Sequence, residues 1–561
     1  MTSEFFVHKG GASRTVTRSE ELLRIAALPR YDIAELTDRA QSIILDCIKP
    51  TGDMKIRPLQ MQALTAAFHT GGLAGLLSVG SGKTLVASLI PSLFPDSRAL
   101  ILAKAGLVSQ GERMMREYSD SFSISSSVRW MSYDFLSRAG GTDILTHIKP
   151  DIIIADEAQC LSNPKAARTK RFLRYMEEHP QTMFFFLSGT ITRHSLKDFA
   201  HLMALALEEG SPVPRTWAPI TEWAECLDSD QGCRYPGALS MLSPTQELLP
   251  DIDAGRRVVQ ARIKDTLGVV ASEAGSVEAT ITFKPLKIKP SEKIQKALVS
   301  LHETWTRPDG EELVSAIDVW RLRGQFLLGG YYKWVEKPPV KWIDARKNWH
   351  RGLREFLSKH SAPHIDSPLL VTNAIRAQNA TLLKGHMTPL TGLYQAWKIQ
   401  EATFPVPNVK WEWIDFSHLE RLRDEINSLG PSIVWTNYRA PSTALAHILQ
   451  APYYGAGEGD AINAEDGSRT IVASIRAHKE GRNLQAFNRN VMVGSLNAGA
   501  DWEQLIGRTH RAGQEADEIT FHLPLYMKEE LEKGVEDAKY IEALTGNQQK
   551  LSFADREDEL L

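Results

Sequence analysis

The sequence predicts an α/β protein with two lobes, each built around a parallel sheet. Short apolar runs that are typical of buried strands alternate with longer helical stretches, as in βα units. This alternation occurs on both sides of a long intervening region. At 561 residues the chain is also too long for a single hydrophobic core. We therefore expect two α/β lobes in tandem, with helical insertions between and within them.

Composition narrows the class of protein. Apolar and charged fractions of 43% and 24% are ordinary for a folded, water-soluble chain. The longest apolar runs, such as MFFFL at 183–187, are far shorter than the ~20 residues of a membrane span, and the first residues show no signal-peptide pattern. We therefore expect a cytoplasmic protein without a membrane partner. With a net charge of −3, any binding to nucleic acid must come from a local basic patch.

The first motif lies in GGLAGLLSVGSGKTLVASLI, residues 71–90, where an apolar strand, a glycine-rich turn and a helix start follow one another. This is the arrangement of a phosphate-binding loop, in which Gly80, Ser81 and Gly82 let backbone N–H groups converge on phosphate oxygens. Lys83 would reach the outer phosphates, and the Thr84 hydroxyl would bind Mg²⁺. The alternative is a glycine-rich turn that carries a lysine by chance.

The second motif is PDIIIADEAQ, residues 150–159, an apolar strand that ends in two carboxylates. The second acidic site of a phosphate-loop enzyme lies at such a strand end. Asp156 is expected to hold Mg²⁺ through water, and Glu157 is expected to polarise the attacking water. The alternative is a solvated acidic turn.

A third stretch, FFFLSGTITR at 184–193, also runs from an apolar strand into small polar residues. Ser188, Gly189 and Thr190 suit a hydrogen-bond relay that couples a nucleotide site to a neighbouring surface. By itself this stretch is weakly specific.

The fourth motif, QLIGRTHRAGQ at 504–514, places Arg508 and Arg511 three residues apart. This spacing puts both side chains on one face of a short helix. They either supply positive charge to a phosphoryl transfer or make structural salt bridges on a surface helix.

The order of the motifs resembles that of superfamily-two helicases. In chain order they are IRPLQMQAL (56–64), GSGKT (80–84), ALILAKAGLVSQ (99–110), DEAQ (156–159), SGT (188–190), SIVWTNYRA (432–440), IVASIRAHKEGRNLQ (471–485) and QLIGRTHRAGQ (504–514). Two segments, DEAQCLSNPKAARTKRF and HRAGQ, make the resemblance most specific to the Swi/Snf-like DNA-dependent ATPases. The resemblance covers roughly residues 50–525, and the middle of this range has diverged from the family pattern.

The resemblance implies two RecA-like lobes with a site for ATP and Mg²⁺ in the cleft between them. We expect lobe one at about 51–285 and lobe two at about 286–530. A helical insertion rich in aromatic and basic residues is expected at about 300–425. Residues 1–50 are expected to form an N-terminal helical extension, and residues 531–561 a charged helical tail.

Further site residues follow from the resemblance alone. Gln60 is expected to read the adenine edge, with Arg57 and Pro58 shaping that pocket. Four positions depart from the family pattern. Gln159 stands where histidine is usual, Lys104 replaces a customary proline, and Leu77 and Ser78 stand where two acidic residues commonly precede the phosphate loop.

The arginine segment also acquires a role by resemblance. Arg508 and Arg511 would act as arginine fingers delivered from lobe two, so that hydrolysis depends on closure of the lobes. Gln504 and His510 would position this segment. His510 fits a satisfied core or surface histidine equally well.

The implied partner is DNA, by preference duplex. The backbone track is expected on the motif loops, at Lys104 and Ser109 in lobe one and at Asn437, Arg439 and Ser474 in lobe two. Eight of the thirteen tryptophans fall between 305 and 413, where ten basic residues outnumber three acidic ones from 321 to 359. These aromatics either stack on nucleic acid or form the core of the insertion.

The implied activity is ATP-driven translocation on duplex DNA, with remodelling of DNA or protein–DNA complexes. A compact monomer of bacterial or viral type is expected, working in the cytoplasm of a bacterial or infected host cell. One alternative is a helicase that separates the strands of DNA or RNA. The other is a nucleotide-gated clamp on nucleic acid with little turnover.

Overall fold

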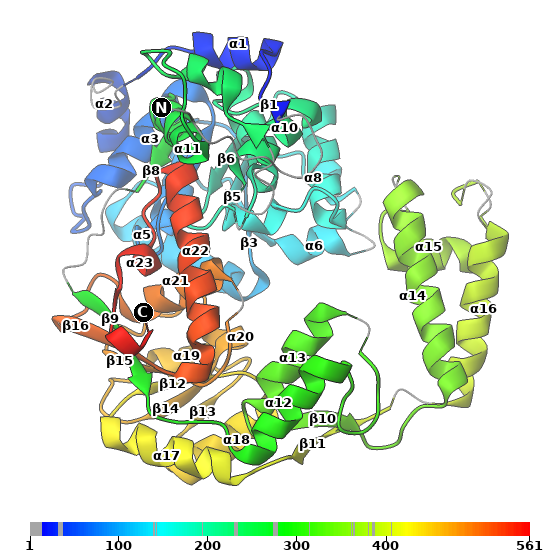
Figure 1. The fold of residues 1–561 in the computed structure, drawn as a ribbon. Coiled ribbons are helices and arrows are strands. Elements are labelled where there is room, and N and C mark those ends of the chain that lie inside the picture. The colour runs from blue at the N-terminus through cyan, green and yellow to red at the C-terminus, as the bar shows by residue number, and fades with distance from the viewer. Residues whose placement is uncertain are drawn as a thin grey trace, which may run out of the picture.

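The computed structural model describes residues 14–31, 38–138, 141, 143–192, 194–228, 234–272, 279–313, 315–360, 362, 365–379, 381–383, 387–404, 407–496 and 498–560. Two large sheets with only parallel neighbours form the body of the molecule, one in its upper half and one in its lower half (Figure 1). The expected α/β class is therefore confirmed. Among the described residues, none of the helices combines the length and apolar character needed to cross a membrane.

The first sheet has the strand order β4-β3-β5-β6-β2-β8. Its strands are β2 Leu73–Leu76, β3 Ala99–Ala103, β4 Val128–Ser132, β5 Ile152–Asp156, β6 Met183–Leu187 and β8 Val269–Ala271. Phe184 and Phe186 pack into the core on one face, while Phe185 and Leu187 pack into the core on the other. Because helices cover both faces, these strands are apolar throughout, which explains their continuous apolar runs in the sequence.

The helices around the first sheet come mostly from residues 58–264. They are α3 Pro58–Thr70, α4 Lys83–Leu89, α5 Val108–Ser121, α6 Tyr133–Ser137, α7 Ile144–Ile148, α8 Ala167–Glu178, α9 Ala200–Leu207, α10 Trp217–Leu227 and α11 Ile252–Lys264. The expected N-terminal extension adds β1 Arg14–Thr15, α1 Glu20–Ala27 and α2 Asp38–Asp46, with β1 paired to β7 Arg234–Tyr235.

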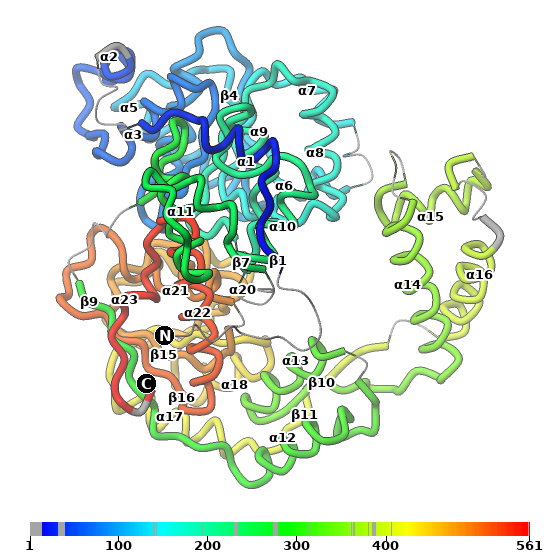
Figure 2. Tube along the Cα trace, turned by 45° about the horizontal axis from the view of Figure 1, so that its top comes forward, coloured from blue at the N-terminus to red at the C-terminus, as the bar shows by residue number. Residues whose placement is uncertain are grey.

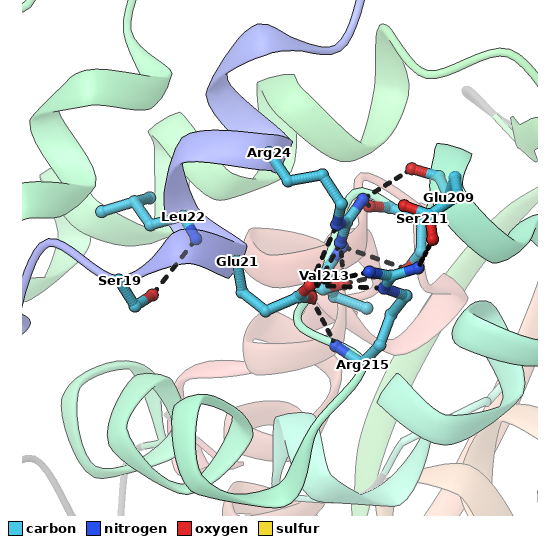
Figure 3. Close-up of polar contacts among 8 residues, drawn as sticks. All are labelled: Ser19, Glu21, Leu22, Arg24, Glu209, Ser211, Val213 and Arg215. Atoms are coloured by element: carbon cyan, nitrogen blue, oxygen red, sulfur yellow. Dashed lines mark hydrogen bonds and ion pairs between the residues drawn. The ribbon is translucent and has the colours of Figure 1, made fainter.

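A partly buried charge cluster fastens α1 to the first lobe (Figure 3). The Glu21 carboxylate accepts hydrogen bonds from Arg24 at 3.0 Å and from Arg215 at 3.0 Å. Arg24 also donates to backbone carbonyls, including that of Ser211 at 2.9 Å. Partial burial alone would raise the pKa of Glu21, but the hydrogen bonds from the two arginines outweigh it and lower the pKa to about 2.

The second sheet has the order β13-β14-β12-β15-β16-β9-β17. Its strands are β9 Thr280–Leu286, β12 Ile433–Thr436, β13 Tyr453–Tyr454, β14 Ile471–Ser474, β15 Arg489–Met492, β16 Glu518–Pro524 and β17 Asp555–Arg556. Its helices are α17 Ser417–Leu429, α18 Arg439–Leu449, α19 Gly459–Asn463, α20 Ile475–His478, α21 Gly499–Thr509, α22 Lys528–Thr545 and α23 Lys550–Phe553. Since β9 pairs with β16, the chain passes to the second sheet before the boundary at 285/286 that we expected.

The insertion consists of two parts. The first contains α12 Glu292–Thr304, α13 Ala316–Phe326 and the antiparallel pair β10 Gly330–Trp334 and β11 Val409–Trp413. The second is a helical unit of α14 Val340–His360, α15 Pro368–Arg376 and α16 Met387–Thr403, which stands apart from both sheets (Figures 1 and 2). Trp342, Trp349 and Trp397 are buried in the core of this unit, so these tryptophans have the core role that the sequence left open.

The C-terminal segment differs from the charged tail that we expected. Helix α22 packs on α11 and α21, and in Figure 1 it extends from the upper half of the molecule into the lower half. Leu531 and Val535 enter the core of the second lobe, and Tyr540 and Leu544 enter that of the first. The segment carries many charged residues, but its apolar residues recur at helical spacing and form a stripe on one face of α22. This stripe is buried because it packs against both lobes.

Candidate active site

The sequence motifs meet because three strands of the first sheet are neighbours. In the order β5-β6-β2 all strands are parallel, so their carboxyl ends lie at one edge of the sheet. The glycine-rich loop follows β2, Asp156 and Glu157 lie at the end of β5, and Ser188 follows β6. The Lys83 ammonium donates to the carbonyls of Leu77 and Ser78 at 3.2 and 3.3 Å and lies 3.7 Å from Glu157 Oε1.

A cavity of about 460 Å³ opens between this sheet edge and elements of the second lobe. It collects most residues that we expected at a nucleotide site. Those in its lining are Arg57, Gln60, Gly80, Gly82, Lys83, Thr84, Asp156, Glu157, Gln504, Arg508 and Arg511. Side chains more than 400 residues apart in the chain therefore face one cavity.

Gln60 braces the glycine-rich loop. Its amide nitrogen donates to the Ser81 carbonyl at 3.1 Å, and its amide oxygen accepts from the Arg57 N–H at 2.9 Å. Gly82 has φ 84°, and a Cβ there would lie 2.2 Å from Gln60 Nε2. Glycine is thus required both for the backbone conformation and for this close approach.

The two carboxylates at the end of β5 differ in environment. Burial and the neighbouring Glu157 raise the pKa of Asp156 to about 7, and its Oδ1 is buried without a hydrogen-bond partner. Burial would also raise the pKa of Glu157, but Lys83 and Lys104 hold it below its usual value. A carboxylate oxygen without a partner and the Thr84 hydroxyl in the same lining are oxygen donors of the kind that Mg²⁺ prefers, so the residues present fit this ion.

Glu157 is at the centre of a hydrogen-bond relay. Its Oε2 accepts from Gln159 at 2.5 Å and, across the two lobes, from Gln504 at 3.2 Å. The Ser188 hydroxyl donates to Gln159 Oε1 at 2.7 Å and accepts from the Thr190 N–H at 3.2 Å. The glutamine that departs from the family pattern therefore connects the expected coupling residues to Glu157. Glu157 also has φ 58°, a conformation that is uncommon outside glycine and is often found at functional sites.

Arg508 lies in α21, but this helix ends at Thr509, so the prediction that Arg508 and Arg511 share one helix face is wrong. They meet because both donate to the same carbonyl, that of Arg482, at 3.2 and 3.0 Å. Burial, together with the neighbouring Arg511, lowers the pKa of Arg508 to about 10. In the part of the chain that the structure describes, no carboxylate forms an ion pair with either guanidinium. The alternative of structural salt bridges on a surface helix therefore does not apply to this pair.

Helix α21 reaches the cavity because of Gly507. A Cβ at this position would lie 2.4 Å from Cγ1 of Val79, which is part of the glycine-rich loop. Glycine thus allows a helix of the second lobe to contact that loop directly.

Two groups of residues at the site carry no motif that could have predicted them. One is an apolar wall of the cavity, formed by Met54, Met114, Tyr118 and Trp130, whose positions in the sequence look like ordinary core positions. The Trp130 indole N–H is buried in this wall without a hydrogen-bond partner.

The other group is the C-terminal segment after α22. Asn547 and Gln549 donate to the carbonyl of Gly189 at 2.8 and 3.2 Å. The Lys550 ammonium lies 3.0 Å from Nδ1 of His510, whose Nε2 lies 2.9 Å from the Ala279 carbonyl. Burial and Lys550 lower the pKa of His510 to about 4, so His510 is a satisfied, buried, neutral histidine.

The expected nucleic-acid residues divide between two clefts. A cleft at the carboxyl ends of β12 and β14 is lined by Asn437, Arg439 and Ser474. Lys104 lines a different cleft, where its ammonium pairs with Glu480 of the second lobe at 2.6 Å. Ser109 is exposed on α5 and lines neither cleft.

Comparison with known proteins gives no further guidance. No protein-family model and no curated protein matches the chain.

Proposed function

We propose that the cavity binds ATP with Mg²⁺ and hydrolyses it, and that the protein is an ATP-driven motor on duplex DNA of the Swi/Snf-like type. The observation that carries this proposal is the set of cations at one cavity. Lys83 comes from a glycine-rich loop, and Arg508 and Arg511 come from the other lobe without carboxylate partners. Burying such charges is costly unless an anion compensates them, and a polyphosphate has the matching charge.

Binding is assigned to the glycine-rich loop and its surroundings. Backbone N–H groups at residues 80–84 and the Lys83 ammonium would hold the phosphates, while the apolar wall with Trp130 would receive the base. Thr84 and Asp156 would hold the metal. When bound, Mg²⁺ neutralises charge on the phosphate oxygens.

Hydrolysis is assigned to Glu157 and the two arginines. Gln159 and Gln504 both occupy Glu157 Oε2. Oε1, which lies 3.7 Å from the Lys83 ammonium and accepts no hydrogen bond from a described residue, would orient and polarise the attacking water. Arg508 and Arg511 would stabilise the negative charge that develops on the phosphate oxygens. Because these arginines come from lobe two, turnover would require lobe closure, and lobe closure would provide the movement.

The motor assignment is supported by the architecture. Two parallel sheets with helices on both faces flank the cavity, in agreement with the two RecA-like lobes that the motif order implies. The cleft with Asn437, Arg439 and Ser474 offers polar and cationic groups for a phosphate backbone. We place the protein among compact bacterial or viral motors that act in the cytoplasm as monomers.

Steady-state ATP hydrolysis tests the proposal, measured without nucleic acid and with single-stranded DNA, duplex DNA or RNA. We expect hydrolysis that duplex DNA stimulates most strongly, with little separation of a plain duplex. The Glu157→Gln variant is the control, since it should bind ATP and not hydrolyse it. Stimulation by single strands together with efficient unwinding would indicate a helicase, and ATP binding without turnover would indicate a nucleotide-gated clamp.

A further inference from the structure

The helical unit α14–α16 belongs to the insertion of lobe two, yet its far end docks on lobe one. Asp366, just before α15, accepts from Arg171 of α8 at 2.8 Å and makes a second contact with the same guanidinium. The side chains of Asp366 and Arg171 are buried, at 2% and 1% exposure. The lobes also touch each other directly, as at Gln504 and Glu157. These contacts close a ring of protein through lobe one, the helical unit and lobe two.

One face of α14 is strongly basic. Arg346, Lys347, His350, Arg351 and Arg354 line a cleft of about 1130 Å³ together with residues of α13, α15 and β10. The contacts of these cations are with neutral groups, such as the Trp342 ring and the Asn348 amide, and within the described ranges none forms an ion pair. Partial burial and the charges of Arg346 and Arg354 lower the pKa of His350, which agrees with a locally positive field.

This basic face continues onto lobe two. Arg321 of α13 lines both the α14 cleft and the cleft that holds Asn437, Arg439 and Ser474. In the second cleft, Arg439 and Arg476 also form no ion pair with a described carboxylate, whereas Lys479 is paired with Asp501 at 2.5 Å. A basic surface therefore runs from the second sheet across α13 to α14. On α13, Arg321 is paired with Asp318 at 3.7 Å, whereas the cations of α14 have no such partner among the described residues.

We propose that this surface binds the phosphate backbone of duplex DNA and that the contact between Asp366 and Arg171 closes a ring around it. The inference rests on the proposed function for the identity of the polymer. Cations at successive turns on one helix face suit contact with consecutive phosphates. A nucleic acid held between α14 and lobe two would be enclosed by the chain, so loading on a strand without ends requires the Asp366 contact to open.

The first test removes the charge of the α14 face in the full-length protein. The variant is Arg346→Ala, Lys347→Ala, Arg351→Ala and Arg354→Ala, and the matched control replaces four exposed lysines outside both clefts, Lys287, Lys289, Lys293 and Lys296. The slope of log affinity for duplex DNA against log salt should fall in magnitude by about 3–4 in the α14 variant and by less than about 1 in the control. Hydrolysis without DNA should not change. Equal slopes in the two variants would overturn the proposed surface.

The second test asks whether the ring encloses DNA. The half-life of the complex after a salt challenge is compared on a closed circular duplex and on the same duplex made linear. We expect the circle to retain the protein at least about tenfold longer, and Asp366→Ala to abolish this difference. Asp366→Asn, which keeps the side-chain shape, is a second variant in case the first unfolds. Equal half-lives for the parental protein would overturn enclosure, whereas an absence of DNA binding and of DNA-stimulated hydrolysis would instead contradict the proposed function.

Discussion

At the residue scale, the distinctive feature of the site is how Glu157 is held. Two amides occupy one carboxylate oxygen, Gln159 from the same loop and Gln504 from the other lobe. Ser188 in turn orients Gln159. In the proposed mechanism Glu157 is the general base, and a side chain held from two sides is pre-organised for that role.

Gln159→Leu should therefore lower kcat by about 10- to 100-fold, as loss of an orienting partner typically does. ATP affinity should change little, because Gln159 does not line the cavity. Ser188→Ala removes only the outer bond and should have a smaller effect. Parental turnover in Gln159→Leu, measured beside nucleotide affinity, would show that the relay does not orient the base.

The residues of the site were predictable to the extent that their chemistry is encoded locally. Lys83, Asp156 and Glu157 follow apolar strands within single motifs, so their meeting at one sheet edge could be expected. The role of Gln159 could not, since its partner Ser188 lies 29 positions away and their contact depends on the pairing of β5 with β6. Trp130 also carries no local signal.

At the element scale, two terminal segments are tied to the lobes by polar contacts. The cluster at Glu21 fastens α1, and its pKa of about 2 lies below the 4.5 of an unperturbed glutamate. A lowered pKa in the fold means that the carboxylate stabilises the protein fully above about pH 4.5 and that this contribution is lost as the pH falls toward 2.

Glu21→Gln should thus reduce the free energy of unfolding by about 1–3 kcal/mol at pH 7, with the difference from the parental protein shrinking between pH 4.5 and 2. Denaturant unfolding over a pH series measures it. A difference that stays constant over this range would show that the Glu21 charge does not stabilise the fold.

The C-terminal segment is the second tie. Replacing both Asn547 and Gln549 by alanine leaves the buried Gly189 carbonyl without these donors, which should cost about 1–3 kcal/mol of stability. Gln548→Ala is the matched control, because the Gln548 side-chain oxygen has no hydrogen-bond partner among the described residues. If the control lowers the melting temperature as much as the double variant, these two bonds do not stabilise the junction.

Some helices and strands could be predicted from the sequence, and others could not. Apolar runs predicted strands such as β5 and β6, because a sheet buried on both faces leaves no polar positions. Helix α22 looked like a solvated tail, since its apolar stripe is narrow among many charges and is stabilised only by contact with both lobes. Strand β9 belongs to the second sheet because it pairs with β16, and the local sequence pattern of residues 280–286 does not encode this pairing.

At the scale of the whole molecule, the proposed hydrolysis requires lobe two to approach the glycine-rich loop closely. Gly507 faces Val79 with no room for a side chain, so Gly507→Ala should keep the lobes apart and lower kcat by about 10- to 100-fold. Because an added Cβ would also lie 2.9 Å from Val79 Cβ, the compensating change is Val79→Gly, and the double variant should recover part of the activity. Parental turnover in Gly507→Ala alone would mean that this approach is not needed.

The central claim is that lobe two completes the site with Arg508 and Arg511, and turnover of their alanine variants tests it most directly. Each substitution should lower kcat by roughly 10³-fold, a loss of about 4 kcal/mol of transition-state stabilisation, while ATP affinity and the melting temperature change much less. Lysine should rescue poorly, because it lacks the planar fork of guanidinium. DNA-stimulated turnover close to the parental rate in both alanine variants would contradict the claim.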